Sequence, residues 1–164
     1  MMLTFGRTRL VSVGRLNEDT FLCHGVLEDY IYSMELDVEI KRPNLEISAI
    51  TGKMKRVTNS QCQKAEGKLA DAIGFSVLDP DFEVKVKRIV GRQGCRNFAD
   101  LLIECCDSFM QLVTYEGWQQ VSTKDSAAKE AYWKKLLEGT PRLLNSCIAY
   151  SDKSPMVNRI GIES

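Results

Sequence analysis

Residues 34–41 read MELDVEIK, and this stretch decides the first half of the fold. Apolar side chains alternate strictly with charged ones, which is the period of a β-strand that buries one face. A turn signal, Pro-Asn, follows at residues 43–44, and the alternation resumes over residues 45–49. Upstream, residues 3–13 and 20–32 are two more strand candidates. Four consecutive strands predict an antiparallel meander with one buried face.

The second half of the chain has a helical period. Apolar spacing predicts helices over residues 58–74, 98–117 and 124–137, while residues 82–87 fit either a short strand or the start of a helix. The apolar stripe of the first helix comprises Cys62, Ala65, Leu69, Ala72 and Ile73. Strands followed by helices predict an α+β fold, with an N-terminal antiparallel β-meander of about four strands packed by about three C-terminal helices.

The length of 164 residues is that of one domain, which can build a core without disulfides. The chain has no internal repeat and no low-complexity tract that would mark a boundary. We expect a single α+β domain over residues 1–150 and an irregular C-terminal tail over residues 151–164.

Charge and hydropathy exclude several classes of function. Basic and acidic residues number 22 each, so no long-range field would attract nucleic acid or an anionic membrane. We interpret the basic groups within residues 53–56 and 85–92 as solvated faces. No apolar run approaches the ~20 residues of a membrane helix. Residues 1–10 lack the apolar core of a signal peptide. We therefore expect a cytoplasmic protein that binds neither nucleic acid nor membranes.

Thiols are the most reactive groups in this sequence, which has six cysteines and one histidine. The cysteines form no C-x-x-C pair, and in the cytoplasm we expect them to be reduced. They are Cys23, Cys62, Cys95, Cys105, Cys106 and Cys147. The helical pattern places Cys105 in the core and Cys106 at the edge of the same stripe. Cys62 also lies on an apolar stripe, which favours a structural role.

Cys95 is the main candidate for chemistry, because it stands at the expected start of the longest helix. Free N–H groups and partial positive charge at a helix N-terminus lower the pKa of a thiol. Gly94 leaves room for a ligand near the backbone, and Arg96 adds positive charge. We therefore treat Gly94, Arg96 and Asn97 as candidate binding residues. A base for Cys95 would have to be His24, the one histidine.

Four short motifs together resemble a bacterial family of unknown activity, domain of unknown function 2889. They are Gly25-Val26-Leu27-Glu28-Asp29, a helix opening with Cys62, Gly94-Cys95-Arg96-Asn97-Phe98, and Cys147-Ile148-Ala149-Tyr150. The resemblance covers roughly residues 5–150. At the position of Asn97 the family motif has histidine, so any ligand or base role of that histidine is lost or replaced here.

The layout of a sheet with two cysteine-led helices also resembles iron–sulfur scaffold proteins of the IscU and NifU type. This resemblance implies a metal site with thiolates from Cys62, Cys95 and Cys147 and a fourth ligand from Asp29 or His24. Thiolates suit zinc or an iron–sulfur cluster, so these are the cofactors it implies.

Three hypotheses follow from the sequence. The first is a non-catalytic binding or assembly module for a protein partner or a second copy, with Trp118 and Trp133 as contributors to an apolar surface. The second is the thiolate metal or iron–sulfur protein. The third is a thiol enzyme with Cys95 as nucleophile. Because no base is placed near Cys95 by sequence, we favour the first and lean against an enzyme.

Overall fold

The computed structural model describes residues 4–121 and 124–162. These residues form two compact units. The first contains residues up to 77 together with 81–110, and the second contains residues 78–80 and those from 111 onward. The expected single domain over residues 1–150 stays a prediction.

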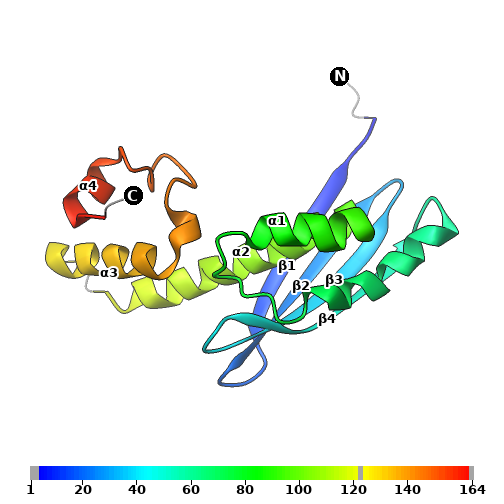
Figure 1. Cartoon of the computed structure of the whole chain (residues 1–164), viewed down its shortest axis with the longest axis horizontal. Coiled ribbons are helices and arrows are strands. Elements are labelled where there is room, and N and C mark those ends of the chain that lie inside the picture. Colours follow the sequence, from blue (N-terminus) through cyan, green and yellow to red (C-terminus); the bar gives the residue numbers. More distant parts are fainter. Residues whose placement is uncertain (1–3, 122–123, 163–164) are drawn as a thin grey trace. The chain divides into compact units, whose positions relative to one another are not determined.

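The first unit is built on an antiparallel sheet (Figure 1). Its strands are β1 (Arg7–Arg15), β2 (Thr20–Asp29), β3 (Ser33–Lys41) and β4 (Glu46–Arg56), in the spatial order β1-β2-β3-β4. Each strand pairs with the next one along the chain. The α+β fold and the four-stranded meander predicted from the alternating pattern are confirmed.

One face of this sheet is buried, as the alternation in β3 predicts. The apolar side chains of β3 are fully buried, whereas its charged side chains stay partly exposed. In β4 the buried residues Ile47 and Ile50 are three apart, which breaks the period of two. The cause is a register shift between Glu39 and Ile40, where Ser48 is left unpaired. This bulge returns the rest of β4 to the buried face.

Helical segments follow the sheet in the first unit. They are the 3₁₀ helices η1 (Ser60–Ala65) and η2 (Gly67–Ala72), helix α1 (Phe82–Val86), the π-helical turn η3 (Lys87–Arg92) and helix α2 (Arg96–Gln119), whose residues from 111 onward belong to the second unit. Helix α2 packs on the sheet, where the rings of Phe21 and Phe109 lie 5.1 Å apart. In the described ranges, no helix is long and apolar enough to cross a membrane.

One helix prediction needs correction, and one alternative left open by the sequence is decided. The single α-helix expected over residues 58–74 is wrong, because η1 and η2 occupy this segment and Ile73 is exposed. Apolar residues three and four apart fit a 3₁₀ helix as well as an α-helix, so spacing alone could not separate the two. Residues 82–87 are helical, as one of the two alternatives predicted, and the helical path continues to Arg92.

The second unit has its own small core. After the end of α2 come α3 (Ser126–Gly139), η4 (Pro141–Leu143) and α4 (Pro155–Ile160). Buried Leu137 of α3 packs with buried side chains of α4, and Trp133 packs against this cluster. The Trp133 ring also lies 5.2 Å from that of Trp118, and both side chains are half-buried. Their predicted contribution to an apolar partner surface stays a prediction.

The tail predicted to be irregular over residues 151–164 contains helix α4. The side chain of Ser154 caps the helix by accepting a hydrogen bond from the N–H of Met156, and Pro155 occupies the first helical position. Gly161 ends the helix at a positive φ of 66°. Such start and stop signals are local, but six residues are too few to show a helical period.

Close packing of α2 on the sheet requires Gly25 in β2. A Cβ at this position would lie 2.8 Å from the sulfur of Cys105 and 3.0 Å from Leu101, both in the core. We expect Gly25→Ala to cost about 1–3 kcal/mol of the free energy of unfolding through overpacking, measured by denaturant titration. The matched control is Gly14→Ala in β1, where a Cβ meets nothing within 4 Å. Equal stability of the two variants would contradict this packing.

Candidate functional site

The candidate site is a corner of the sheet centred on Asp29, at the end of β2. Its side chain is fully buried and forms an ion pair with Arg7 of β1 at 2.6 Å. The other carboxylate oxygen accepts hydrogen bonds from the N–H groups of Ile31 and Tyr32, each at 2.6 Å. The carboxylate therefore joins two strands and the turn between β2 and β3, and both of its oxygens have partners.

The charge state of Asp29 follows from these contacts. Burial acts to raise the pKa of the carboxyl group, but the N–H groups of Tyr32 and Ile31 and the guanidinium of Arg7 together lower it. Hydrogen bonds and a cation both favour the charged form. Asp29 is thus held as a carboxylate that stabilises the corner.

Two further side chains complete the corner. The guanidinium of Arg56, from β4, donates to Glu28 and to the carbonyl oxygen of Asp29. Asn97, in the first turn of α2, accepts a long hydrogen bond of 3.5 Å from Arg7. Asp29 and Asn97, singled out from separate motifs, therefore meet at one arginine. Arg7 was not predicted, because it is one of many basic residues and only the pairing of β1 with β2 shows its role.

A pocket of about 520 Å³ opens beside this corner. It is lined by Gly6, Thr8, Glu28, Asp29, Tyr30 and Arg56. The ring of Tyr30 lies 6.0 Å from that of Phe5, and both rings are more than half exposed. The pocket thus has charged groups, which already have ionic partners, and an exposed aromatic rim.

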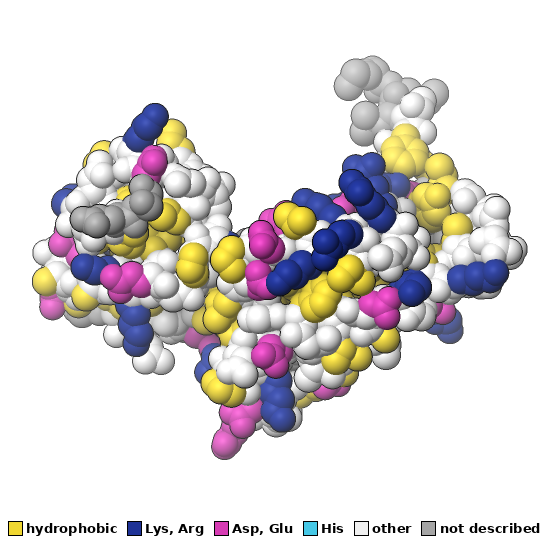
Figure 2. Space-filling model, in the orientation of Figure 1, with side chains coloured by type: hydrophobic (Ala, Val, Ile, Leu, Met, Phe, Trp, Pro, Cys, Tyr) yellow, Lys and Arg dark blue, Asp and Glu magenta, His cyan; other side chains and the backbone are white. Residues whose placement is uncertain are grey.

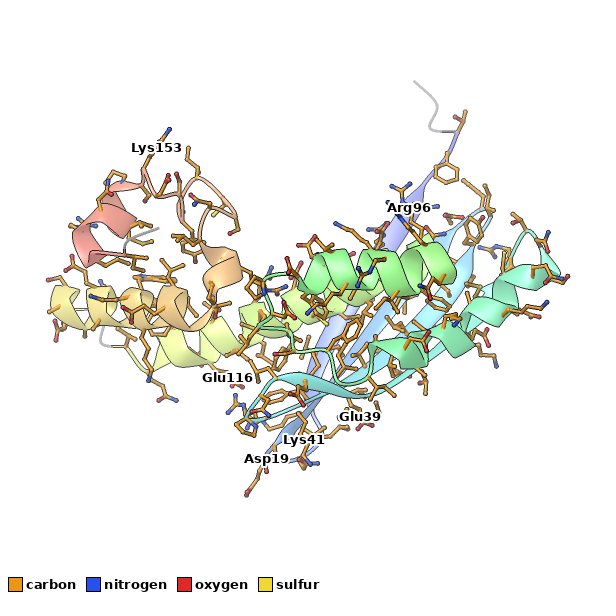
Figure 3. All side chains as sticks on the ribbon, in the orientation of Figure 1. Asp19, Glu39, Lys41, Arg96, Glu116 and Lys153 are labelled. Carbon is orange, nitrogen blue, oxygen red and sulfur yellow. The ribbon has the colours of Figure 1, made fainter. Side chains whose placement is uncertain are left out.

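Cys95 immediately precedes α2, as predicted. Its N–H donates to the carbonyl of Val90, and its carbonyl accepts from Ala99. The room expected at Gly94 is filled, since a Cβ there would lie 2.7 Å from the carbonyl oxygen of Val90 and 2.9 Å from Lys68. Arg96 extends into solvent (Figure 3), with its side chain 91% exposed. A binding role for Gly94, Arg96 and Asn97 stays a prediction.

The other cysteines lie in different environments. Cys62 is half-buried in η1, and Cys147 is exposed in the second unit. Cys105 is in the core as predicted, and Cys106 is also buried instead of lying at an edge. Burial raises the pKa of the Cys23 thiol to about 12, and it also raises that of Cys105. These two thiols are therefore inert core groups.

A metal site finds no geometric basis in the ranges that the structure describes. Among residues 4–121 and 124–162, no group of three or more His, Cys, Asp or Glu side chains could hold a metal ion. Asp29, the predicted fourth ligand, is already bound to Arg7 and to two backbone N–H groups. The set of Cys62, Cys95, Cys147 and Asp29 stays a prediction.

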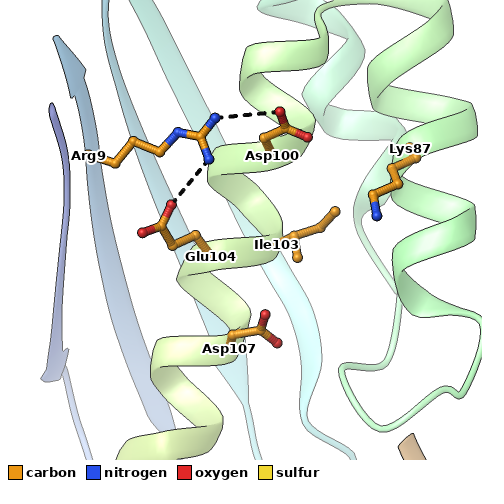
Figure 4. A pocket seen from close by; sticks show the side chains of 6 residues that line it. All are labelled: Arg9, Lys87, Asp100, Ile103, Glu104 and Asp107. Carbon is orange, nitrogen blue, oxygen red and sulfur yellow. Dashed lines mark ion pairs between the residues drawn. The ribbon is translucent and has the colours of Figure 1, made fainter. Parts of the chain in front are cut away.

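A second hollow, of about 360 Å³, lies between β1, η3 and α2 (Figure 4). Arg9 reaches Asp100 at 3.5 Å and Glu104 at 3.6 Å. Lys87, on the opposite wall, forms an ion pair with Glu83 at 2.9 Å, and this hydrogen bond raises the pKa of Lys87. Arg9 is therefore paired within the hollow and Lys87 outside it, and the two contacts of Arg9 fasten β1 to α2.

Basic side chains gather over α1 and the turn that follows it (Figure 2). Lys87, Arg88 and Arg92 of this segment are exposed. With Glu83 paired to Lys87, the segment is a solvated helical face, as the charge balance of the chain predicts.

The face of the sheet opposite α2 carries the one histidine. His24 Nδ1 lies 2.7 Å from Asp37, and Ser12 is the cross-strand neighbour of His24. Ser12, His24 and Asp37 form a row across the sheet, and these are the residue types of a serine nucleophile with its base and the carboxylate that orients it. However, His24 and Asp37 are about half exposed, and none of the three lines a pocket described above. A nucleophile needs a shaped site with oxyanion donors, so we assign no reaction to this row.

The ion pair of Asp29 makes the stability of the corner depend on pH. We expect Asp29→Asn to lower the melting temperature by roughly 5 °C at neutral pH, because it leaves the Arg7 charge without its partner.

The pKa of Asp29 is lower in the fold than in the unfolded chain. The stabilisation is therefore complete above about pH 4 and disappears as the pH falls through the folded pKa. Melting curves between pH 2 and pH 7 would measure it, with Glu18→Gln, an exposed position in the turn between β1 and β2, as control. A difference from wild type that persists undiminished at pH 2 would contradict the ion-pair role.

Comparison with known proteins supports the family and nothing finer. A family described as a protein of unknown function (DUF2889) matches residues 19–111, more than half of the chain. The match includes Asp29, Cys62 and Asn97, whereas the motif at Cys147 lies outside it. No curated protein and no solved structure matches this chain. The chain, whose Asp29 and Asn97 meet at Arg7, belongs to the DUF2889 family of proteins of unknown function.

Proposed function

We propose that this protein is a non-catalytic binding module that holds an extended segment of a partner protein along the outer edge of β1. The observation that carries the proposal is this edge. β1 is nine residues long and stands at one end of the order β1-β2-β3-β4, so it pairs with β2 on one side, and no strand of the described residues pairs with its other side. An edge of this kind can accept an added strand from another chain.

Alternate residues of β1 direct their backbone groups outward. Leu16, which follows β1, donates its N–H to the carbonyl of Thr20 and so continues the pairing with β2. In an antiparallel pair, hydrogen-bonded and non-hydrogen-bonded positions alternate. The N–H and C=O groups that face away from β2 are therefore those of Arg7, Arg9, Val11, Val13 and Arg15. Together they form a row of donors and acceptors for a partner backbone.

The two edge strands of the sheet, β1 and β4, differ in how far their outer edges are covered. The outer edge of β4 is covered in part: Ile47 exchanges hydrogen bonds with Phe75 and Gly74 in the segment after η2, and the N–H of Met54 donates to the side chain of Glu66. β1 has no such cover among the described residues, no proline and no bulge in its register with β2. Natural sheets normally protect a long regular edge. The exposed edge of β1 is therefore favoured as a binding surface.

Exposed apolar side chains lie along β1 and at both of its ends. Leu10 projects from β1 itself, Phe5 precedes it, and Leu16 follows it. Tyr30 and Ile31, in the turn after β2, are also exposed. Together with the pocket of about 520 Å³ at the start of β1, these groups would contact alternate side chains of an added strand.

Charge argues against a second copy as the occupant. In the two-fold register that overlaps all nine residues of β1, Arg7 of one copy would lie opposite Arg15 of the other. Like charges directly opposite in neighbouring strands are destabilising. We therefore propose a segment of a different protein.

A bacterial cytoplasmic setting, expected from the sequence, is part of the proposal. The cytoplasmic part is supported by the six free cysteines, as in a reducing compartment. The likeness to iron–sulfur scaffolds and the cysteine metal site have no observation in their favour, so we do not propose them as the function.

Hydrogen exchange of the backbone amides tests directly which N–H groups of β1 point away from β2. We expect the amide protons of Arg9, Val11 and Val13 to exchange quickly with solvent, because they point away from β2. The amide protons of Leu10 and Ser12 should exchange slowly, because they bond to β2. Hydrogen–deuterium exchange followed by NMR measures each amide. Equal protection at all five positions would mean that the outer edge is covered.

Proline substitution tests binding at the edge. Val11→Pro removes an outward N–H without breaking the ladder to β2, so the variant should fold. We expect peptides selected on the wild-type protein from a displayed library of random peptides to bind Val11→Pro at least about tenfold more weakly. The affinity is measured by titration calorimetry. Val11→Thr, which keeps the N–H, should bind the peptides as the wild type does.

Two comparisons complete this experiment. Ser12→Pro breaks a bond to β2 and should lower the melting temperature, whereas Val11→Pro should leave it nearly unchanged. Selected peptides that bind Val11→Pro as tightly as wild type would contradict binding at the edge. A dimer of the wild-type protein that is lost in Val11→Pro would replace the partner protein with a second copy.

A further inference from the structure

A pocket of about 440 Å³ lies inside the second unit, between the end of α2 and α3. Val113 and Gly117 of α2 form one wall, and Tyr132, Lys135 and Leu136 of α3 form the other. This volume is within the range of roughly 300–1,000 Å³ that is typical of small-molecule sites. The pocket shares no residue with the edge of β1.

The walls are apolar and held in place. The hydroxyl of Tyr132 donates to the carbonyl of Thr114 at 2.6 Å, so its polar end is occupied and the ring contributes an apolar wall. The same ring contacts Trp118 and Trp133, at centroid distances of 5.6 and 5.2 Å. These two tryptophans therefore hold the ring in place, and their fluorescence can detect a ligand that binds against it.

Two glycines shape the space. A Cβ at Gly117 would lie 3.0 Å from the ring of Tyr132, so glycine lets the helices approach closely. A Cβ at Gly139, the last residue of α3, would meet nothing within 4 Å. The pocket is therefore open where Gly139 lines it, and a larger side chain at this position would enter free space.

Lys135 supplies the one charge in the lining. Its neighbours on α3 are paired, Lys134 with Glu138 at 4.0 Å and Glu130 with Arg159 at 3.5 Å. Within the described part of the chain no ion pair involves Lys135, and no acidic residue lines the pocket. An apolar cavity with a single ammonium group attracts anions and repels cations.

We propose that this pocket binds amphipathic carboxylates of the medium-chain fatty acid class. The tail lies against Val113, Leu136 and the ring of Tyr132, and the carboxylate pairs with Lys135. A small hydrophilic anion such as phosphate fits less well, because one lysine offers no second cation and the remaining walls are apolar. The proposal does not depend on the function proposed for β1.

Titration of the full chain with decanoate, below its micellar concentration, tests the site by calorimetry and by the fluorescence of Trp118 and Trp133. We expect saturable binding, with octanoate weaker by up to about fifteenfold, because each buried methylene contributes up to about fourfold. Lys135→Met should weaken decanoate about fivefold and leave neutral decanol unchanged. Gly139→Leu should abolish the binding of both compounds by filling the pocket.

Lys134→Met is the matched control, since it removes a charge from the same helix outside the pocket, and its decanoate affinity should equal that of wild type. Circular dichroism confirms that each variant keeps its helices. Absence of decanoate binding would overturn the proposal. So would binding that Lys135→Met and Gly139→Leu both leave unchanged, because the carboxylate would then bind elsewhere.

Discussion

The structure of the first unit depends on the burial of one face of a four-stranded sheet. The apolar residues of β3 are fully buried, and the apolar stripe of α2 packs on this face of the sheet at β2 and β4. Because successive side chains in a strand alternate between faces, one covered face requires one register for every strand. The bulge at Ser48 keeps β4 in this arrangement, and Gly25 lets α2 approach β2 closely.

β1 is the exception to this mode of stabilisation, since none of its side chains is buried. It is held by its ladder to β2 and by three ionic contacts, one from Arg7 to Asp29 and two from Arg9 to Asp100 and Glu104. Polar contacts thus fix the strand on the side of α2, while its outer backbone edge stays available. The same feature that gives β1 little apolar stabilisation makes it suitable for adding a strand from another protein.

The second unit contributes a different kind of surface. A small apolar core around Leu137 joins α3 to α4, and the aromatic side chains of Trp118, Tyr132 and Trp133 pack beside it. Between α2 and α3 this packing leaves an apolar pocket with Lys135 in its lining. The protein therefore offers two independent candidate surfaces, a backbone edge for an extended chain and a cavity for a small amphipathic anion.

The sequence alone determined the meander, the buried face of β3, the course of α2 and the core position of Cys105, because these follow from apolar periodicity over neighbouring residues. It also carried the family motifs that contain Asp29 and Asn97. Only the tertiary structure decided that these two residues meet at Arg7, which lies 22 residues from Asp29 and 90 from Asn97 along the chain. The exposed edge of β1 and the pocket at Lys135 were also beyond the sequence. A periodic pattern shows which face is apolar, but which side chains pair and which edge stays open depend on contacts between distant segments.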